Sequence, residues 1–94
     1  MYSLIETSRF KKDLKRISRQ SKQDLIKTFN TLDILKKEGV KGIPQRMLPH
    51  RLRGDFKKNW ECHIKPDLLL IWSQNEEENK IVLIRVGSHV ELFS

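Results

Sequence analysis

The sequence predicts an α+β fold: a short N-terminal strand, a helical hairpin and then a three-stranded antiparallel meander. Apolar residues recur at helical spacing in the first half of the chain. In the second half they alternate with polar residues or form short continuous runs, and a Gly- and Pro-containing stretch separates the halves. Consecutive helices followed by consecutive strands are typical of a sheet covered on one face by helices. We expect one domain over residues 1–94, because a chain of this length has room for one core.

The first half of the chain begins with an expected strand at residues 2–6. A helix is expected to follow, with Thr7 or Ser8 as its N-cap. Three apolar residues then recur at i, i+4 and i+7, and the positions between them are mostly charged. The three apolar residues are Phe10, Leu14 and Ile17. This pattern predicts an amphipathic helix with one buried face.

A second helix is expected from Ser21, because Asp24 three residues later completes a capping pattern. Its apolar face contains Leu25, Phe29, Leu32 and Leu35. Gly39 can end the helix. Residues 39–49 include Gly42, Pro44 and Pro49 and are expected to form a loop.

The meander is expected from Phe56 onward, where the apolar period changes to two. One face of this strand is expected to carry Phe56, Lys58, Trp60, Cys62 and Ile64, and the other Lys57, Asn59, Glu61 and His63. The sequence Lys-Pro-Asp at 65–67 predicts a tight turn. The apolar run 68–72 predicts a central strand covered on both faces. Residues 81–86 predict the last strand, interrupted by Arg85.

The composition is strongly basic, with 19 Lys and Arg residues against 12 acidic residues and a formal charge of +7. Such a charge favours RNA, DNA or an acidic protein as partner, although a merely solvated basic surface is the alternative. The single cysteine, Cys62, excludes an intramolecular disulfide and fits a reducing compartment. The N-terminus does not resemble a signal peptide, and no apolar run reaches membrane-spanning length. We therefore expect a cytoplasmic protein without a membrane partner.

All three histidines, His50, His63 and His89, lie in the second half of the chain beside predicted strand ends. Imidazole is the side chain best matched to proton transfer near neutral pH. Across the tight turn, His63 and Asp67 can be near neighbours. The alternatives are an unpartnered loop histidine at His50, an ordinary C-terminal residue at His89, and an exposed His63 with Asp67 only serving the turn.

Two other side chains stand out. Arg85 lies within an apolar run, on the expected face of Ile81 and Leu83, and requires an ion pair, a snorkelling side chain or a bound phosphate. Phe93 could fill a gap in the core or stack on a base.

Neither metal nor thiol chemistry is expected. The three histidines and Asp67 could in principle ligate zinc, but short ligand spacings are absent, so we expect no metal and no cofactor. Cys62 falls in the apolar set of its strand, where a thiol is inert.

Four stretches of the second half are distinctive: Leu52-Arg53-Gly54, Trp60-Glu61-Cys62-His63-Ile64-Lys65-Pro66-Asp67, Leu83-Ile84-Arg85-Val86-Gly87-Ser88-His89 and Glu91-Leu92-Phe93. Through these residues the chain resembles the YafQ branch of the RelE/ParE toxin superfamily. The resemblance covers the whole chain in element order and is specific from His50 to Phe93. It implies a RelE-like β-α-α-β-β-β sandwich and a bacterial type II toxin.

Relatives of this branch cut mRNA in the ribosomal A site without a metal: the ribose 2′-OH attacks the 3′-phosphate and leaves a cyclic phosphate and a 5′-OH. Five positions match residues that YafQ-like toxins use: His50, His63, Asp67, His89 and Phe93. Arg85 matches an arginine of close relatives, and the position of Glu61 is often Asp. We also expect Phe93, Glu61, Lys57 and Arg53 to contact the substrate.

In-line attack needs a base, an acid and positive charge on the phosphorane. We expect His50 or His63 near the 2′-OH and His89 as the acid. Arg85 or a protonated imidazole would supply the charge. Asp67 could hold His63 in one tautomer or act on the proton itself.

The resemblance also implies partners. They are the ribosome with its mRNA and a cognate antitoxin, expected to be a DinJ/RelB-like ribbon-helix-helix protein, with operator DNA reached only through the antitoxin complex. The alternatives are a ParE-like toxin that inhibits DNA gyrase without cleaving RNA and a non-enzymatic RNA-binding domain. A gyrase binder has no need of three histidines and an aspartate around one surface.

Overall fold

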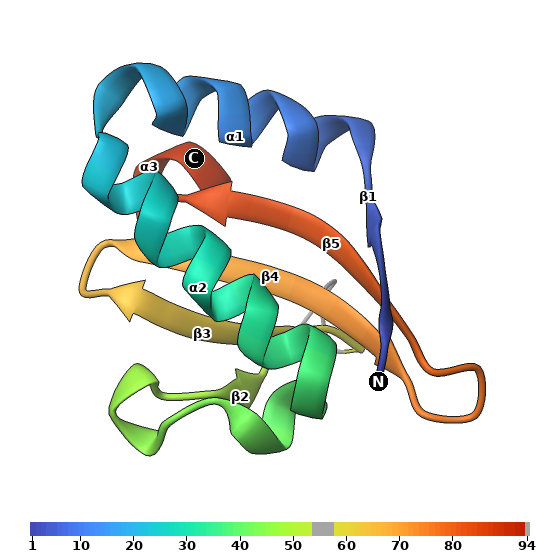
Figure 1. The fold of residues 1–94 in the computed structure, drawn as a ribbon. Coiled ribbons are helices and arrows are strands. Elements are labelled where there is room, and N and C mark those ends of the chain that lie inside the picture. The colour runs from blue at the N-terminus through green and yellow to red at the C-terminus, as the bar shows by residue number, and fades with distance from the viewer. Residues whose placement is uncertain (54–57, 94) are drawn as a thin grey trace.

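The structure, a computed structural model, describes residues 1–53 and 58–93. Two long helices cover one face of a five-stranded sheet, and a short helix follows the last strand (Figure 1). The α+β prediction is thus confirmed. The elements in order are β1 (Ser3–Glu6), α1 (Ser8–Gln20), α2 (Lys22–Glu38), η1 (Gly39–Gly42), η2 (Gln45–Met47), β2 (His50–Arg51), β3 (Trp60–Lys65), β4 (Leu68–Asn75), β5 (Lys80–Gly87) and α3 (His89–Phe93).

The strand order in the sheet is β1-β5-β4-β3-β2. Strand β1 pairs with β5 in parallel, and the other neighbours are antiparallel, so β3, β4 and β5 form the predicted meander. The sequence did not predict the two-residue strand β2, the helix α3 or the short helical turns η1 and η2 in the expected loop. Within the described part of the chain, β3 begins at Trp60. Phe56 and Lys57, which were expected in this strand, lie outside the described residues.

Side chains that the sequence singled out cap the two long helices. The Thr7 hydroxyl accepts a hydrogen bond from the Phe10 backbone N–H at the start of α1. The Ser21 hydroxyl accepts one from the Asp24 N–H at the start of α2, as predicted. Gly39 ends α2 with φ +68°, a backbone conformation that favours glycine.

The core lies between the helices and the sheet. Its largest fully buried side chains are Trp72, Phe10, Leu35, Leu70, Ile81, Leu83 and Val86. The continuous run 68–72 is buried along its whole length, as predicted for a central strand.

A β-bulge interrupts the alternation of β5. Ile71 pairs with Arg85, whereas the next residue, Trp72, pairs with Leu83, so Ile84 is the extra residue. Because of it Val86, and not Arg85, joins Leu83 in the core, and the expected placement of Arg85 with Ile81 and Leu83 is wrong.

None of the described helices is both long and apolar enough to cross a lipid bilayer.

Candidate functional site

The predicted site residues meet at one end of the sheet. Strand β4 runs antiparallel to both β3 and β5, so the end of β3, the start of β4 and the end of β5 lie together. These three points carry His63, Asp67 and His89. The short strand β2 adds His50, which pairs directly with Glu61 on β3.

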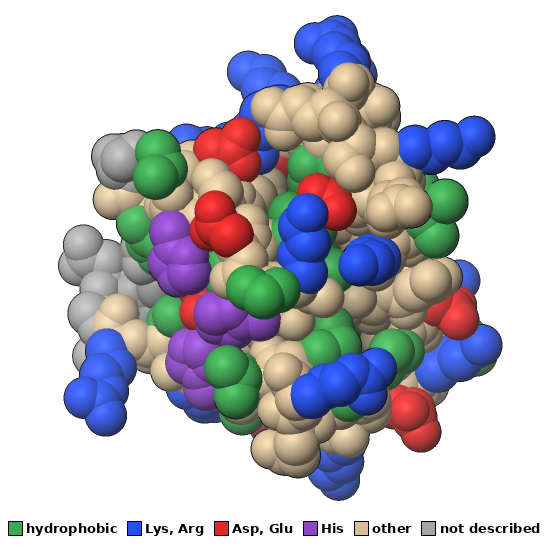
Figure 2. Space-filling view, turned by 90° about the vertical axis from the view of Figure 1, so that its left-hand side faces the viewer, with side chains coloured by type: hydrophobic (Ala, Val, Ile, Leu, Met, Phe, Trp, Pro, Cys, Tyr) green, Lys and Arg blue, Asp and Glu red, His purple; other side chains and the backbone are tan. Residues whose placement is uncertain are grey.

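The three imidazole rings form a row on the surface. The ring centroids of His50 and His63 are 6.4 Å apart, and those of His63 and His89 are 6.0 Å apart. The ring of Phe93 continues the row, with its centroid 6.3 Å from that of His89. Figure 2 shows the histidines gathered on one face beside acidic side chains, with Lys and Arg side chains spread around them. One phosphodiester group can therefore reach more than one imidazole.

Each imidazole directs its Nδ1 atom at an oxygen acceptor. Nδ1 of His50 is 2.7 Å from the Leu48 carbonyl oxygen, and Nδ1 of His63 is 3.3 Å from that of Pro66. Nδ1 of His89 is 3.0 Å from Oδ1 of Asp67. Since these oxygens can only accept, Nδ1–H is the donor in each ring. Nε2 is therefore the nitrogen that each ring can use for proton transfer.

Glu61 lies beneath two of the rings. Its side chain is only 7% exposed, and its Oε1 atom lies 3.2 Å from Nε2 of His50 and 4.0 Å from Nε2 of His63. The first distance allows a hydrogen bond when His50 is protonated, but the second is too long for one. Alternation placed Glu61 on the polar face with His63, but its burial was not predicted. The Glu61 carboxylate is therefore within contact distance of the His50 ring.

Asp67 contacts His89 and not His63, so the expected pairing of His63 with Asp67 is wrong. The turn at 66–67 puts the carbonyl of Pro66 against His63, whereas the carboxylate of Asp67 accepts hydrogen bonds from the N–H and the ring of His89. The backbone bond, followed by the ring bond, lowers the pKa of Asp67 below its ordinary value. Asp67 is therefore ionised at neutral pH and accepts both hydrogen bonds from His89 as a carboxylate.

Arg85 is engaged in an ion pair. Its Nε atom donates to Oδ2 of Asp13 at 2.8 Å, and its side chain is 13% exposed. The hydrogen bond to Asp13 raises the pKa of Arg85 although burial opposes the shift. Of the three interpretations of an arginine in this strand, the structure supports the ion pair.

The remaining predicted residues are placed as follows. Phe93 is 47% exposed, so it does not fill a gap in the core. Arg53 is exposed, and Lys57 lies outside the described residues.

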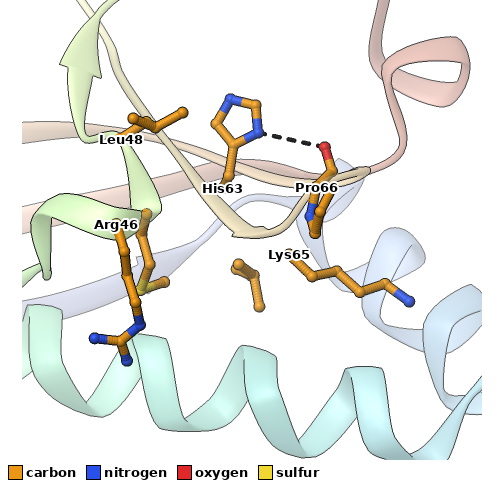
Figure 3. Close-up of a pocket in the computed structure, with 7 residues that line it drawn as sticks. Arg46, Leu48, His63, Lys65 and Pro66 are labelled. Carbon is orange, nitrogen blue, oxygen red and sulfur yellow. Dashed lines mark hydrogen bonds between the residues drawn. The ribbon is translucent and has the colours of Figure 1, made fainter.

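A cavity of about 560 Å³ opens beside His63, between η2 and the turn from β3 to β4. It is lined by Arg46, Met47, Leu48, His63, Ile64, Lys65 and Pro66. Figure 3 shows His63 pointing away from α2 at the rim, with Arg46 and Lys65 on opposite sides. Lys65 forms an ion pair with Asp24, but Arg46 has no hydrogen bond or ion pair with another described residue. Arg46 was not predicted as a site residue, because a lone basic residue in a loop carries no sequence pattern.

No group of three or more His, Cys, Asp or Glu residues among residues 1–53 and 58–93 has the arrangement of a metal site. The two acidic residues of the site, Asp67 and Glu61, contact the imidazole rings of histidines instead.

The Cys62 thiol is predicted to be unreactive in the folded protein. Burial, followed by the nearby charge of Glu61, raises the pKa of this thiol to about 12, so little thiolate forms at pH 8. We expect a chromogenic disulfide reagent to leave Cys62 unmodified in the native protein and to modify one thiol per chain in guanidinium chloride. Rapid modification of the native protein would contradict the burial of this thiol.

The family of the chain follows from comparison with known proteins. A family model described as "Bacterial toxin of type II toxin-antitoxin system, YafQ" matches residues 2–94. The match defines the class of the protein as a bacterial toxin of a type II toxin–antitoxin system. Within that class, the chain belongs to the YafQ family. A search of the curated proteins gave no match.

Solved structures support the same fold. A metal-bound toxin from Helicobacter pylori is 35% identical with a TM-score of 0.86, over 99% of this chain and 100% of that one. YafQ from E. coli strain BL21(DE3) is 22% identical with a TM-score of 0.88, over 100% of both chains. YafQ in the E. coli DinJ–YafQ complex is 24% identical with a TM-score of 0.82, over 100% of both chains. At these last two identities the likeness is one of fold.

Proposed function

We propose that this toxin is a ribosome-dependent mRNA endoribonuclease that cleaves codons in the A site without a metal and so inhibits translation. The observation that carries the proposal is the row of three imidazoles, spaced 6.4 and 6.0 Å, in which His63 and His89 bond through Nδ1 and keep Nε2 for proton transfer. Cleavage of RNA through its own 2′-OH needs two groups at the phosphate. A proton acceptor lies on the side of the 2′-OH, and a proton donor lies on the side of the leaving oxygen. Membership of the YafQ family supports the same activity.

The proposed reaction is an internal transesterification. Nε2 of a neutral imidazole takes the proton of the ribose 2′-OH, and the oxygen then attacks the adjacent phosphorus. The bond from phosphorus to O5′ breaks, and a protonated imidazole gives its Nε2 proton to O5′. The products are a 2′,3′-cyclic phosphate and a free 5′-OH, and no water, metal or electron is consumed.

The contacts of the rings suggest how the roles divide. We assign the acid to His89, because the hydrogen bond from its Nδ1–H to Asp67 fixes the ring and leaves Nε2 to face the leaving O5′. His63 suits the base, since its Nε2 atom lies too far from Glu61 for a hydrogen bond and can accept the 2′-OH proton. His50, in contact with Glu61, suits stabilisation of the phosphorane as a cation. Phe93 would brace or stack on a displaced base beside His89.

Basic residues on α1 are proposed to hold ribosomal RNA. The exposed ones are Arg9, Lys11, Lys12, Lys15 and Arg19. Their attraction for phosphates is screened by salt, so ribosome binding should weaken as the salt concentration rises. Arg53 and Lys57 would add substrate contacts. Action on ribosomes also implies the cytoplasm as its location.

A cognate antitoxin is the expected protein partner. The family description assigns its members to toxin–antitoxin systems, and YafQ of E. coli has been solved as a complex with DinJ. The proposed neutralising protein is therefore similar to DinJ, and operator DNA would be reached only through the complex.

Primer extension on mRNA in programmed ribosomes tests the proposed function. We expect new 3′ ends within the A-site codon, carrying cyclic phosphates, in the presence of EDTA. A supercoiling assay with DNA gyrase runs in parallel. Inhibited gyrase together with intact mRNA would replace the proposal by a ParE-like activity, and ribosome binding without either effect would favour a non-enzymatic RNA-binding protein.

Arg46 is predicted to contact a phosphate of the bound RNA, because its guanidinium is unpaired among the described residues and lines the cavity beside His63. We expect Arg46→Gln to weaken binding of a fluorescent single-stranded oligoribonucleotide. The slope of log affinity against log salt concentration should fall by about 0.7, as expected for one lost phosphate contact. Fluorescence anisotropy at several salt concentrations measures the affinity and its salt dependence. Lys36→Gln, on the exposed end of α2, is the matched control, and equal effects in the two variants would exclude a specific contact.

A further inference from the structure

A buried carboxylate joins α1 to β5. Asp13 is 2% exposed. Its Oδ1 atom accepts from Arg16 at 2.9 Å and from Arg85 at 3.1 Å. Its Oδ2 atom accepts from Arg85 Nε at 2.8 Å and from the Val86 backbone N–H at 3.0 Å. Four hydrogen bonds satisfy the carboxylate fully and fix both guanidinium groups at the end of β5.

Arg16 extends this network to α3. Its guanidinium donates to the Val86 carbonyl at 3.1 Å, and its Nε atom lies 2.8 Å from Oε2 of Glu91. The other oxygen of Glu91 accepts from the Ser88 N–H at 2.8 Å, while the Ser88 hydroxyl accepts from the Glu91 N–H at 3.1 Å. Ser88 and Glu91 thus form a capping box at the start of α3.

Helix α3 depends on these polar contacts. It has only five residues, and none of them is buried. So short a helix is not stable on its own in water. The packing beneath it is close, because a Cβ atom at Gly87 would lie 2.7 Å from the Arg16 guanidinium and 2.9 Å from Oε1 of Glu91.

His89 is the first residue of α3, and its N–H and ring both donate to Asp67, which lies in the turn between β3 and β4. The position of α3 therefore sets the distance between His89 and Asp67 and the distance between His89 and His63. We propose that Arg16 and Glu91 are positioning residues, which hold α3 so that the His89 imidazole stays against Asp67 in its Nδ1–H tautomer. The inference deepens the proposed function and rests on it for its catalytic consequence.

Variants of Glu91 test the positioning role. Glu91→Ala removes both the capping box and the ion pair with Arg16, whereas Glu91→Gln keeps an oxygen acceptor for the Ser88 N–H and loses only the charge. Glu77→Gln is the matched control, since Glu77 is an exposed acid in the turn between β4 and β5. The direct readout is the ¹⁵N spectrum of the His89 ring, together with exchange of the Leu92 amide, which bonds to the Ser88 carbonyl in α3.

We expect Glu91→Ala to lose the Nδ1–H signature of the His89 ring and the protection of the Leu92 amide. Glu91→Gln should retain part of the Nδ1–H signature and part of the amide protection, and Glu77→Gln should retain both in full. Cleavage by Glu91→Ala should show a kcat about 10-fold lower, since the acid is misplaced, and a raised KM, since Phe93 lies on the same helix. If Glu91→Ala fails to fold, the same measurements on Glu91→Gln decide whether Glu91 positions His89.

The structural and catalytic outcomes separate the two proposals. An unchanged His89 ring spectrum in folded Glu91→Ala would overturn the positioning role. A changed His89 ring spectrum together with a wild-type kcat would also overturn the positioning role. A changed spectrum in a protein whose wild type leaves mRNA intact would retain the structural linkage and reject the proposed function.

Discussion

Replacing His89 with alanine is expected to lower the rate of mRNA cleavage by about 100-fold or more, because loss of a general acid commonly removes that much of the rate. His89 is exposed and its ring forms an ion pair with the exposed Asp67, so the variant should stay folded and unfold at a temperature close to that of the wild type. Ribosome binding should also remain, since the basic residues of α1 are unchanged. Primer extension on programmed ribosomes measures the rate, and sedimentation with ribosomes measures binding.

His89→Gln separates proton transfer from hydrogen bonding. Its side-chain amide can still donate a hydrogen bond but cannot give up a proton near neutral pH. We expect a loss close to that of alanine. A glutamine variant with near wild-type cleavage would instead make His89 a hydrogen-bond donor to the phosphate. Unchanged cleavage in both His89→Ala and His63→Ala would remove the catalytic assignment of this face.

Much of the site could be predicted from the sequence, because an antiparallel meander brings particular strand ends together. The turn at 66–67 fixes where β3 ends and β4 begins, and the next antiparallel strand returns to that same end. His63, Asp67 and His89 therefore had to lie near one another. Their pairing could not be predicted, because it depends on the direction in which each side chain leaves the turn.

His50 was harder to place. It reaches the site through β2, a strand of two residues that follows a Pro-containing loop. Two residues are too few to show alternation, so the sequence offered His50 as a candidate histidine, but only the resemblance to toxins placed it at the site. The burial of Glu61 follows from the same pairing and was missed for the same reason.

Asp13 was also missed, although the sequence carried a signal for it. It lies three residues after Phe10 and four before Ile17, which puts its carboxylate on the apolar face of α1. A charged residue at such a position needs a buried partner, and the arginine within the apolar run of β5 is one. The bulge at Ile84 shifts Arg85 out of the alternation of β5 and has no sequence signal of its own.

Replacing Asp13 with asparagine is expected to destabilise the fold by about 3–5 kcal/mol at pH 7, as when one partner of a buried ion pair is removed. The amide keeps the volume of the carboxylate, but Arg85 and Arg16 would lose their countercharge. A domain of this size has a total stability of about 5–15 kcal/mol, so the variant should lose a large share of its stability. Urea unfolding measures the difference. Asp33→Asn is the matched control: its pair with Lys37 is about 60% exposed on each side chain, and we expect less than about 1 kcal/mol.

The pH dependence gives a second, independent check on Asp13. Burial alone would raise the pKa of this carboxyl, but the hydrogen bonds from Arg85, Val86 N–H and Arg16 outweigh it and lower the pKa below its ordinary value. A lowered pKa in the folded state contributes stability above the unfolded value, about 3.9, and that stability is lost as the pH falls through the folded value. The gap in unfolding free energy between wild type and Asp13→Asn should therefore be full at pH 7 and narrow below about pH 4. A gap that stayed constant down to pH 2 would mean that the carboxylate charge does not stabilise this network, and that the shape of the side chain is what α1 and β5 require.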